Sequence, residues 1–192
     1  MEIEQIDGEP FVSPGGKSFN NRDNNRRSIT ILGDSMIKDI KAHKMKTKLK
    51  MNERIYVKSF PGATVEDMAD YVKPSLKRAP DLVVLHAGTN NLRLDVTPQQ
   101  IGEKVMKLAM NMKTEANDVM VSGITARSDD PKLARKAQMV NETLLAECNK
   151  HSLYFIDNRN IETEQHLNGS GLHLNFKGTI LLARNFIESI NI

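Results

Sequence analysis

The sequence predicts an α/β protein, a three-layer α/β/α sandwich on a flavodoxin-like parallel five-stranded sheet of order 2-1-3-4-5. From Ser28 onward a strand-like apolar run is followed by a helical period five times over. The third run, residues 82–85, is continuously apolar, as in a strand covered on both faces, whereas Ile55 and Val57 alternate with polar neighbours, as in an edge strand. Because β/α alternation requires right-handed crossovers, an edge-like second strand together with a fully covered third strand favours the strand order 2-1-3-4-5.

The domain is expected to span residues 28–192, after an arm or linker at residues 1–27. That arm contains Pro-Gly-Gly and an Asn/Arg-rich run with few apolar residues and no periodicity, which is typical of disorder. The strands are expected at residues 29–32, 54–59, 81–87, 118–124 and 152–157. The length of 192 residues suits one core that buries roughly 70% of the unfolded surface.

Helix start signals fill the gaps between these strands. Thr64 with Asp67 resembles a capping box, and Pro74 is expected to end or kink the helix that follows. The next three helices are expected to begin at Thr97-Pro98, at Asp130-Pro131 and at Asn175. Cys148, at an apolar helical spacing, is expected in the core.

Composition indicates a soluble globular protein, since 39% of the residues are apolar, 27% are charged and no apolar run has membrane length. The single cysteine excludes an internal disulfide and suits a reducing compartment, so we expect a cytoplasmic protein. The acidic N-terminus, MEIEQIDGEP, lacks the apolar region of a secretory signal.

A serine lies at a predicted strand-to-helix corner in residues 29–37, ITILGDSMI. The β-branched run ends in Gly-Asp-Ser, which places the Oγ of Ser35 at the carboxyl end of a strand and its N–H at a helix start, where negative charge is favoured. An exposed hydroxyl and a backbone N–H that favours negative charge are the two features that a nucleophilic serine requires. Gly-Asp-Ser is also a common turn tripeptide, because Asp and Ser cap helices.

Two other loops are expected at the same edge of the sheet, residues 60–64 and 88–91. Ligands of such sheets bind beyond the carboxyl ends of the first and third strands. A glycine N–H and an asparagine amide from these loops, with the N–H of Ser35, would form an oxyanion hole. His173, immediately before the last helix, returns to this edge and is the candidate base. We interpret His43, His151 and His166 as surface residues and His86 as a hydrogen-bonded strand histidine.

These residues resemble the SGNH (GDSL-like) hydrolase superfamily over residues 28–192. The blocks are Gly33-Asp34-Ser35-Met36, Gly62, Gly88-Thr89-Asn90 and His173. Within this superfamily, the sequence motifs HAGTNN, SGIxxR and GLHLNxKG are most similar to those of esterase-like domains of some LINE-type retrotransposon proteins. The resemblance implies Ser35 as nucleophile, Gly62 and Asn90 as oxyanion donors with Ser35, His173 as general base, and no metal or organic cofactor.

Two departures from that pattern bear on activity. Asn91 stands where the superfamily usually has aspartate, and Ser170 stands three residues before His173, where it has the aspartate that orients the imidazole. Loss of that carboxylate costs on the order of 10⁴ in kcat in other serine hydrolases. A Ser-His dyad of reduced activity is therefore expected, with the Ser170 hydroxyl or a backbone carbonyl orienting His173.

Two basic features suggest partners. Residues 38–50, expected on the helix after Ser35, carry a single acid, Asp39, and form either a solvated helix face or a footprint for RNA or anionic membrane. The lysines are Lys38, Lys41, Lys44, Lys46, Lys48 and Lys50. Arg127 is expected either to contact an anionic group of the substrate or to pair with a surface carboxylate.

Two functions remain open from the sequence. The first is a serine ester hydrolase that acts on small acyl, acetyl or lipid esters through an acyl-enzyme. The second is a catalytically weak SGNH-like domain that serves as a nucleic-acid or protein interaction module. A flavodoxin or receiver-type function is disfavoured, because no acidic Mg²⁺ pocket is evident and the first loop is too short to wrap a flavin phosphate.

Overall fold

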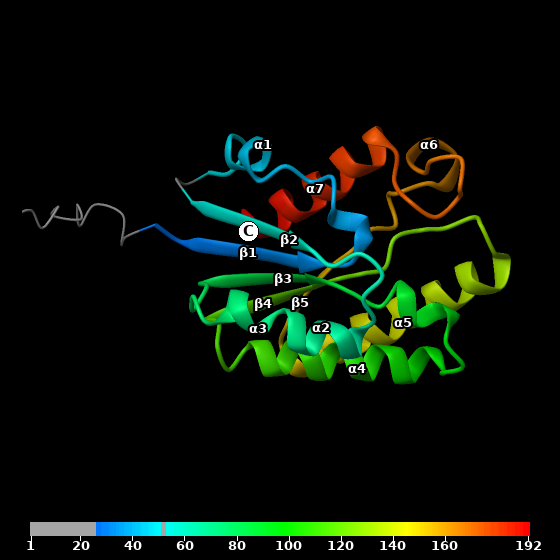
Figure 1. The fold of residues 1–192 in the computed structure, drawn as a ribbon, viewed down its shortest axis with the longest axis horizontal. Helices are drawn as coiled ribbons and strands as arrows, with labels where there is room; N and C mark the ends of the chain where they lie inside the picture. The colour runs from blue at the N-terminus through cyan, green and yellow to red at the C-terminus, as the bar shows by residue number, and fades with distance from the viewer. Residues whose placement is uncertain (1–25, 51–52) are drawn as a thin grey trace, which may run out of the picture.

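The computed structural model describes residues 26–50 and 53–192, in which five parallel strands form one sheet in the order β2-β1-β3-β4-β5. This confirms the predicted fold and strand order (Figure 1). The strands are β1 (Ser28–Gly33), β2 (Arg54–Ser59), β3 (Leu82–His86), β4 (Asp118–Ser122) and β5 (Tyr154–Ile156). Most of the predicted arm, residues 1–25, lies outside the described residues.

Helices cover both faces of the sheet (Figure 1). On one face lie α2 (Val65–Tyr71), α3 (Lys73–Leu76), α4 (Pro98–Met112) and α5 (Pro131–His151); on the other lie α1 (Ala42–Lys46) and α7 (Phe176–Ile190). Short helices η1 (Ser35–Ile37), η2 (Asn90–Arg93) and α6 (Thr163–His166) follow strand ends. No helix of the described part is long and apolar enough to cross a bilayer.

Strand burial follows the predicted pattern. Every residue of β3 is buried, because the strand lies at the centre of the sheet with helices on both faces. Tyr56 and Lys58 of β2 are exposed, as expected of an edge strand. Side chains that alternate along β1 enter two separate cores: Leu32 packs with α2, α4 and α5, and Ile31 packs with α1 and α7.

The predicted helix starts are correct. Thr64 and Thr97 each form a capping box, with Asp67 and Gln100 respectively. Asp130 caps α5 and Asn175 caps α7 through side-chain hydrogen bonds to backbone N–H groups. These helices begin directly after loops that leave the carboxyl ends of strands, so the caps also fix the loops of the site.

The predicted lysine-rich helix after Ser35 is wrong. The chain forms η1, then an extended Lys41, and only the five residues of α1 within residues 38–50. Lys41 offers no side-chain cap, and lysines three or four residues apart repel one another along a helix. The six lysines nonetheless remain together on the surface and all are exposed.

Candidate active site

Ser35 lies at the corner between β1 and η1, and neighbouring strands hold that corner on both sides. The backbone N–H of Asp34 donates to the carbonyl of His86 at 3.2 Å, and the hydroxyl of Ser59 donates to the carbonyl of Asp34 at 2.8 Å. The Asp34 side chain caps η1 by accepting from the N–H of Met36 at 3.0 Å. Ser35 is therefore half-buried on a backbone path fixed by β2 and β3.

Gly33 allows the close approach of β1 and β3 at this corner. A Cβ on Gly33 would lie 2.7 Å from the carbonyl oxygen of His86, closer than real Cβ atoms come to backbone oxygen. The glycine of Gly-Asp-Ser thus serves strand packing directly beneath the serine.

The structure brings Ser35 and His173 together. The Oγ of Ser35 lies 3.2 Å from Nε2 of His173, although 138 residues separate them in the chain. With the proton on Nδ1, Nε2 accepts a hydrogen bond from the serine hydroxyl. This is the geometry of a nucleophile and its base.

A short hairpin between α6 and α7 carries His173. Leu167 and Leu174 form an antiparallel bridge, and the N–H of Asn168 donates to the carbonyl of His173 at 2.8 Å. Asn175 then caps α7 and also donates to the carbonyl of Leu167 at 3.0 Å. The histidine is thus held between a backbone hairpin and the start of a 15-residue helix.

Ser170 lies at the exposed tip of this hairpin, and its hydroxyl does not reach His173. It donates to Oδ1 of Asn168 at 2.6 Å and accepts from the N–H of Leu172 at 3.3 Å. No hydrogen bond reaches Nδ1 of His173 from residues 26–50 or 53–192. The Ser170 hydroxyl, one of the two groups expected from the sequence to orient His173, therefore does not contact it. The hydroxyl is hydrogen-bonded instead to the Asn168 side chain within the same turn.

Gly62 and Asn90 lie on the two neighbouring loops. Gly62 is exposed with φ +80°, a backbone conformation that favours glycine. One N–H of the Asn90 amide donates to the carbonyl of Ala63 at 2.8 Å, which joins the two loops and leaves the second N–H of that amide for another acceptor.

Asn91, at a position where the superfamily usually has aspartate, has a structural role through its side-chain hydrogen bonds. It is fully buried, accepts from the N–H of Val65 at 2.9 Å and donates to Glu66 at 2.8 Å. Lys104 also binds Glu66, and this contact, helped by Asn91, lowers the pKa of Glu66 to about 2. A neutral amide fits here because it pairs with a carboxylate that a second carboxylate would repel.

Arg127 pairs with a carboxylate, which fits the second of its two predicted roles. Its Nε and Nη2 atoms donate to Asp129 at 2.7 and 2.6 Å, and its side chain is only 2% exposed. This pairing lowers the pKa of Asp129. The N–H groups of Ser128 and Asp129 donate to the carbonyl of Gly171, so the pair braces the hairpin of His173.

Sequence reasoning missed a buried polar cluster behind Ser35. Asp34 and His86 are fully buried, and within the described part of the chain neither Oδ2 of Asp34 nor Nε2 of His86 has a hydrogen-bond partner. Nδ1 of His86 lies 2.9 Å from the hydroxyl of Ser122, which also accepts from Asn158. Burial lowers the pKa of His86, and the charge of Asp34 opposes this shift. The interpretation of His86 as a hydrogen-bonded strand histidine holds for one ring nitrogen.

The remaining candidates lie apart from the site. His43 and His151 are exposed, and His166 lies on α6. Cys148 is buried in the core as expected, and burial raises the pKa of its thiol to about 11. Within the part of the chain that the structure describes, no cluster of His, Cys, Asp and Glu side chains could hold a metal ion.

Comparison with known sequences decides the family. The profile of the GDSL-like Lipase/Acylhydrolase family matches residues 31–179, a span that includes Ser35, Gly62, Asn90 and His173. The chain belongs to this family. No curated protein sequence matches the chain.

Solved structures of GDSL-type proteins share the fold. A lipolytic G-D-S-L family protein of Veillonella parvula has a TM-score of 0.73 at 21% identity and covers 84% of this chain and 97% of its own. A lipase/acylhydrolase of Enterococcus faecalis has a TM-score of 0.73 at 21% identity, with coverages of 86% and 95%.

An acetylxylan esterase of Geobacillus stearothermophilus is similar at 13% identity, with a TM-score of 0.73 and coverages of 86% and 94%. It has been solved as catalytic mutants at a serine, at a histidine and at an aspartate. That aspartate lies three positions before the histidine.

Proposed function

We propose that this GDSL-family hydrolase is a serine esterase that works through an acyl-enzyme with a Ser35–His173 dyad. The observation that carries the proposal is the 3.2 Å contact between Oγ of Ser35 and Nε2 of His173. Family membership supports an ester as the substrate.

The dyad would work in two half-reactions. His173 takes the hydroxyl proton as Oγ of Ser35 attacks the ester carbonyl, and it returns the proton to the departing alcohol. Water then attacks the acyl-enzyme by the same route and releases the acid. The N–H groups of Ser35 and Gly62 and the second amide N–H of Asn90 would stabilise the oxyanion.

We propose a reduced turnover relative to family members that carry a complete triad. In the Geobacillus esterase an aspartate three positions before the histidine is named as a catalytic position, and this chain has Ser170 at that spacing. The Ser170 hydroxyl is bonded to Asn168 instead. Loss of the carboxylate lowers kcat by about 10⁴ in a serine protease, which leaves measurable turnover from the other groups.

Hydrolysis of p-nitrophenyl acetate, butyrate and octanoate tests the proposal and ranks acyl length. Ser35→Ala should abolish turnover and fluorophosphonate labelling, while Ser75→Ala, on α3, serves as the matched control. Labelling at a residue other than Ser35, or undiminished turnover in Ser35→Ala, would refute the nucleophile. A folded wild type without turnover on any ester would favour the interaction-module alternative.

We propose that the lysine cluster of residues 38–50 docks on anionic lipid and not on RNA. Lys41, Lys44 and Lys48 border a groove of about 930 Å³ between α1 and α7, and α7 contributes the exposed Phe176 and Ile180. Basic rims with an apolar floor fit anionic headgroups above acyl chains. The groove begins next to His173, since Leu174 lines it, and this favours a lipid ester as substrate.

Vesicle sedimentation tests this docking. Phosphatidylcholine vesicles with 30% phosphatidylglycerol, roughly the anionic content that produces a surface potential of tens of millivolts, should retain the protein at low salt. Lys41→Glu with Lys44→Glu should release it, whereas Lys132→Glu, on the distant α5, should not. Equal binding to uncharged vesicles would remove the role of the lysines.

We also propose kinship with the esterase-like domains of LINE-type retrotransposon proteins. The sequence motifs HAGTNN and GLHLNxKG support this proposal. Sequencing of the genomic neighbourhood tests it: we expect a reverse-transcriptase reading frame beside this gene or beside closely similar copies, and its absence from all of them would contradict the proposal.

A further inference from the structure

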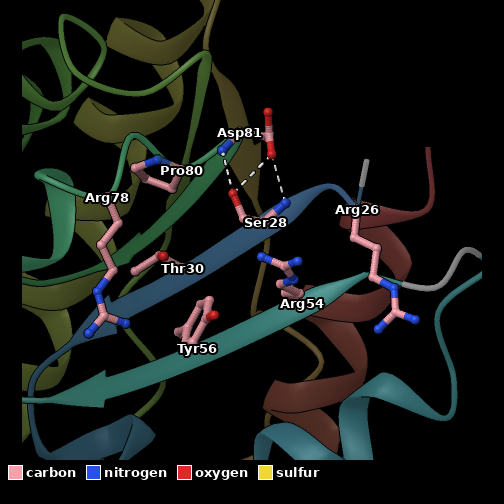
Figure 2. Close-up of a pocket in the computed structure, with 8 residues that line it drawn as sticks. All are labelled: Arg26, Ser28, Thr30, Arg54, Tyr56, Arg78, Pro80 and Asp81. Atoms are coloured by element: carbon pink, nitrogen blue, oxygen red, sulfur yellow. Dashed lines mark hydrogen bonds between the residues drawn. The ribbon is translucent and has the colours of Figure 1, made fainter. Parts of the chain in front are cut away.

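A second hollow lies away from the proposed catalytic residues, on the edge of the sheet formed by β1 and β2. It is lined by Arg26, Ser28, Thr30, Arg54, Tyr56, Arg78, Pro80 and Asp81 (Figure 2). Its volume is about 440 Å³. Three of its eight lining side chains are arginines, and the ring of Tyr56 lies among them.

This hollow continues along β2 as a stripe of alternating cations and aromatic rings. Because side chains alternate between the faces of a strand, Arg54, Tyr56 and Lys58 share one side of β2. Phe60 follows the strand on that side, since Lys58 lies over its ring. The face is open at its centre, since Tyr56 is 41% exposed and Lys58 is exposed. We call these four residues, with Tyr71 and Arg78 beside them, the β2 stripe. It extends for about 20 Å along the strand.

The rings and cations of the β2 stripe stack on one another. The Arg78 guanidinium lies 5.4 Å from the centre of the Tyr56 ring, and Nζ of Lys58 lies 5.4 Å from that of Phe60. The rings of Phe60 and Tyr71 lie 5.6 Å apart. Such contacts hold flat groups in place at an exposed surface, with the outer faces of Arg78 and Tyr71 turned to solvent.

We propose that the β2 stripe binds single-stranded nucleic acid. Unpaired bases stack on aromatic rings and on guanidinium planes, and a row of cations follows the phosphate backbone between them. A duplex would hide its base faces from these rings, and an acidic peptide has few flat groups to stack on them. The lysine cluster of residues 38–50 lacks this interleaving, because it contains no Phe, Tyr or Trp.

One carboxylate lies in the hollow and restricts where phosphates bind. Asp81 accepts hydrogen bonds from the N–H and hydroxyl of Ser28 at 2.7 and 2.9 Å and from Asn117 at 3.0 Å. The two hydrogen bonds from Ser28 lower the pKa of Asp81, so it stays charged at neutral pH. Ser28 is the sheet partner of Arg54, so Asp81 lies at the Arg54 end of the stripe, and phosphates would lie toward Lys58 and Arg78.

The inference does not depend on ester hydrolysis. The stripe does end at Phe60, two residues before Gly62, so a bound strand would lie beside the loop of the proposed oxyanion hole. Ester turnover in each variant therefore serves as an independent check of folding, since the proposed catalytic residues lie outside the stripe.

Fluorescence anisotropy with a labelled oligo(U) 12-mer tests the proposal on the full chain. Tyr56→Ala and Arg78→Glu should each weaken binding about ten-fold. The matched controls are Tyr154→Ala, a tyrosine that is 40% exposed on the opposite edge strand β5, and Arg135→Glu on α5. Binding by the wild type should also fall linearly with salt on logarithmic axes.

Two comparisons can overturn the proposal. If duplex RNA binds as tightly as oligo(U), or if heparin affinity falls as much as oligo(U) affinity in Tyr56→Ala, stacking of bases is refuted. If Lys41→Glu with Lys44→Glu abolishes oligo(U) binding while Arg78→Glu leaves it unchanged, the lysine cluster is the site and the β2 stripe is not. Arg78→Glu lies on an exposed turn, so it tests the proposal even if Tyr56→Ala unfolds the protein.

Discussion

His173, the proposed base, has a hydrogen-bond contact at Nε2, whereas no group of residues 26–50 and 53–192 bonds to its Nδ1. Ser35 occupies Nε2, whereas the Ser170 hydroxyl is bonded to Asn168 at the tip of the hairpin. A ring with one contact is free to turn about its bonds, and its reacting tautomer is not selected by an acceptor on Nδ1. An acceptor at Nδ1 is therefore expected to align the proposed dyad.

Replacement of Ser170 by aspartate should raise kcat about ten-fold. A carboxylate near Nδ1 fixes the tautomer and stabilises the imidazolium that forms during attack, and ten-fold corresponds to about 1.4 kcal/mol of barrier. Because the carboxylate favours the protonated ring, the acid limb of the pH–rate profile should move to higher pH. Initial rates on p-nitrophenyl acetate between pH 5 and 9 measure both effects.

Ser170→Asn is the matched control for this substitution, since it has the same shape without the charge. It should leave the acid limb in place. Unchanged kcat and an unchanged profile in Ser170→Asp would mean that another group already orients His173.

Local sequence signals predicted the elements that carry the site. Capping residues such as Asp130 and Asn175 act within three residues of their own position, so the helix starts could be read directly. The alternation in β2 and the apolar run in β3 fixed the strand order. The proximity of Ser35 and His173 could be expected because each lies at a predicted junction between a strand or loop and a helix.

Features that depend on packing across the fold were not predictable. The hydrogen bonds from Ser128 and Asp129 to the Gly171 carbonyl join two loops that lie far apart in the sequence. The β2 stripe needs Arg78 from the end of α3 to reach Tyr56, a contact that no sequence period encodes. The Asp34–His86 cluster requires β1 and β3 to be neighbours.

The packing of α6 on α7 depends on Gly178. A Cβ at this position would clash with the carbonyl oxygen of His166 and lie 3.0 Å from its carbonyl carbon. Gly178→Ala should therefore lower the free energy of unfolding by about 1–3 kcal/mol. This outweighs the ~1 kcal/mol that alanine gains over glycine within a helix. Because α6 and α7 flank the hairpin of His173, ester turnover should fall as well.

Gly169→Ala is the control in the same hairpin, since no atom lies within 4 Å of its added Cβ. Urea unfolding and turnover of both variants make the comparison. Equal stability of the two variants would show that α6 shifts without cost.

The whole domain holds a neutral histidine and a carboxylate side chain in its interior. His86 contacts Ser122 on β4, and its ring lies 6.4 Å from that of Phe186 on α7. Asp34, at the corner beneath Ser35, is the charged group that faces it. No described residue bonds to Nε2 of this imidazole, and its burial favours the neutral form, so protonation of His86 is expected to favour unfolding.

Stability should therefore fall as the pH drops below 6.5, the ordinary pKa of histidine. The folded-state pKa of His86 is lower, so between the two values the unfolded chain binds a proton that the folded chain does not. Each pH unit in that window removes at most about 1.4 kcal/mol of unfolding free energy. The carboxylates with lowered pKa values add their own loss near and below their ordinary values, pH 4.5 for Glu66 and pH 3.8 for Asp81 and Asp129. Urea unfolding at pH 7.5, 6.5 and 5.5 thus isolates the histidine, and His86→Gln, which keeps a hydrogen-bonding side chain without titrating, should flatten the profile in this range. A profile with the same slope in His86→Gln would assign the titration to another group.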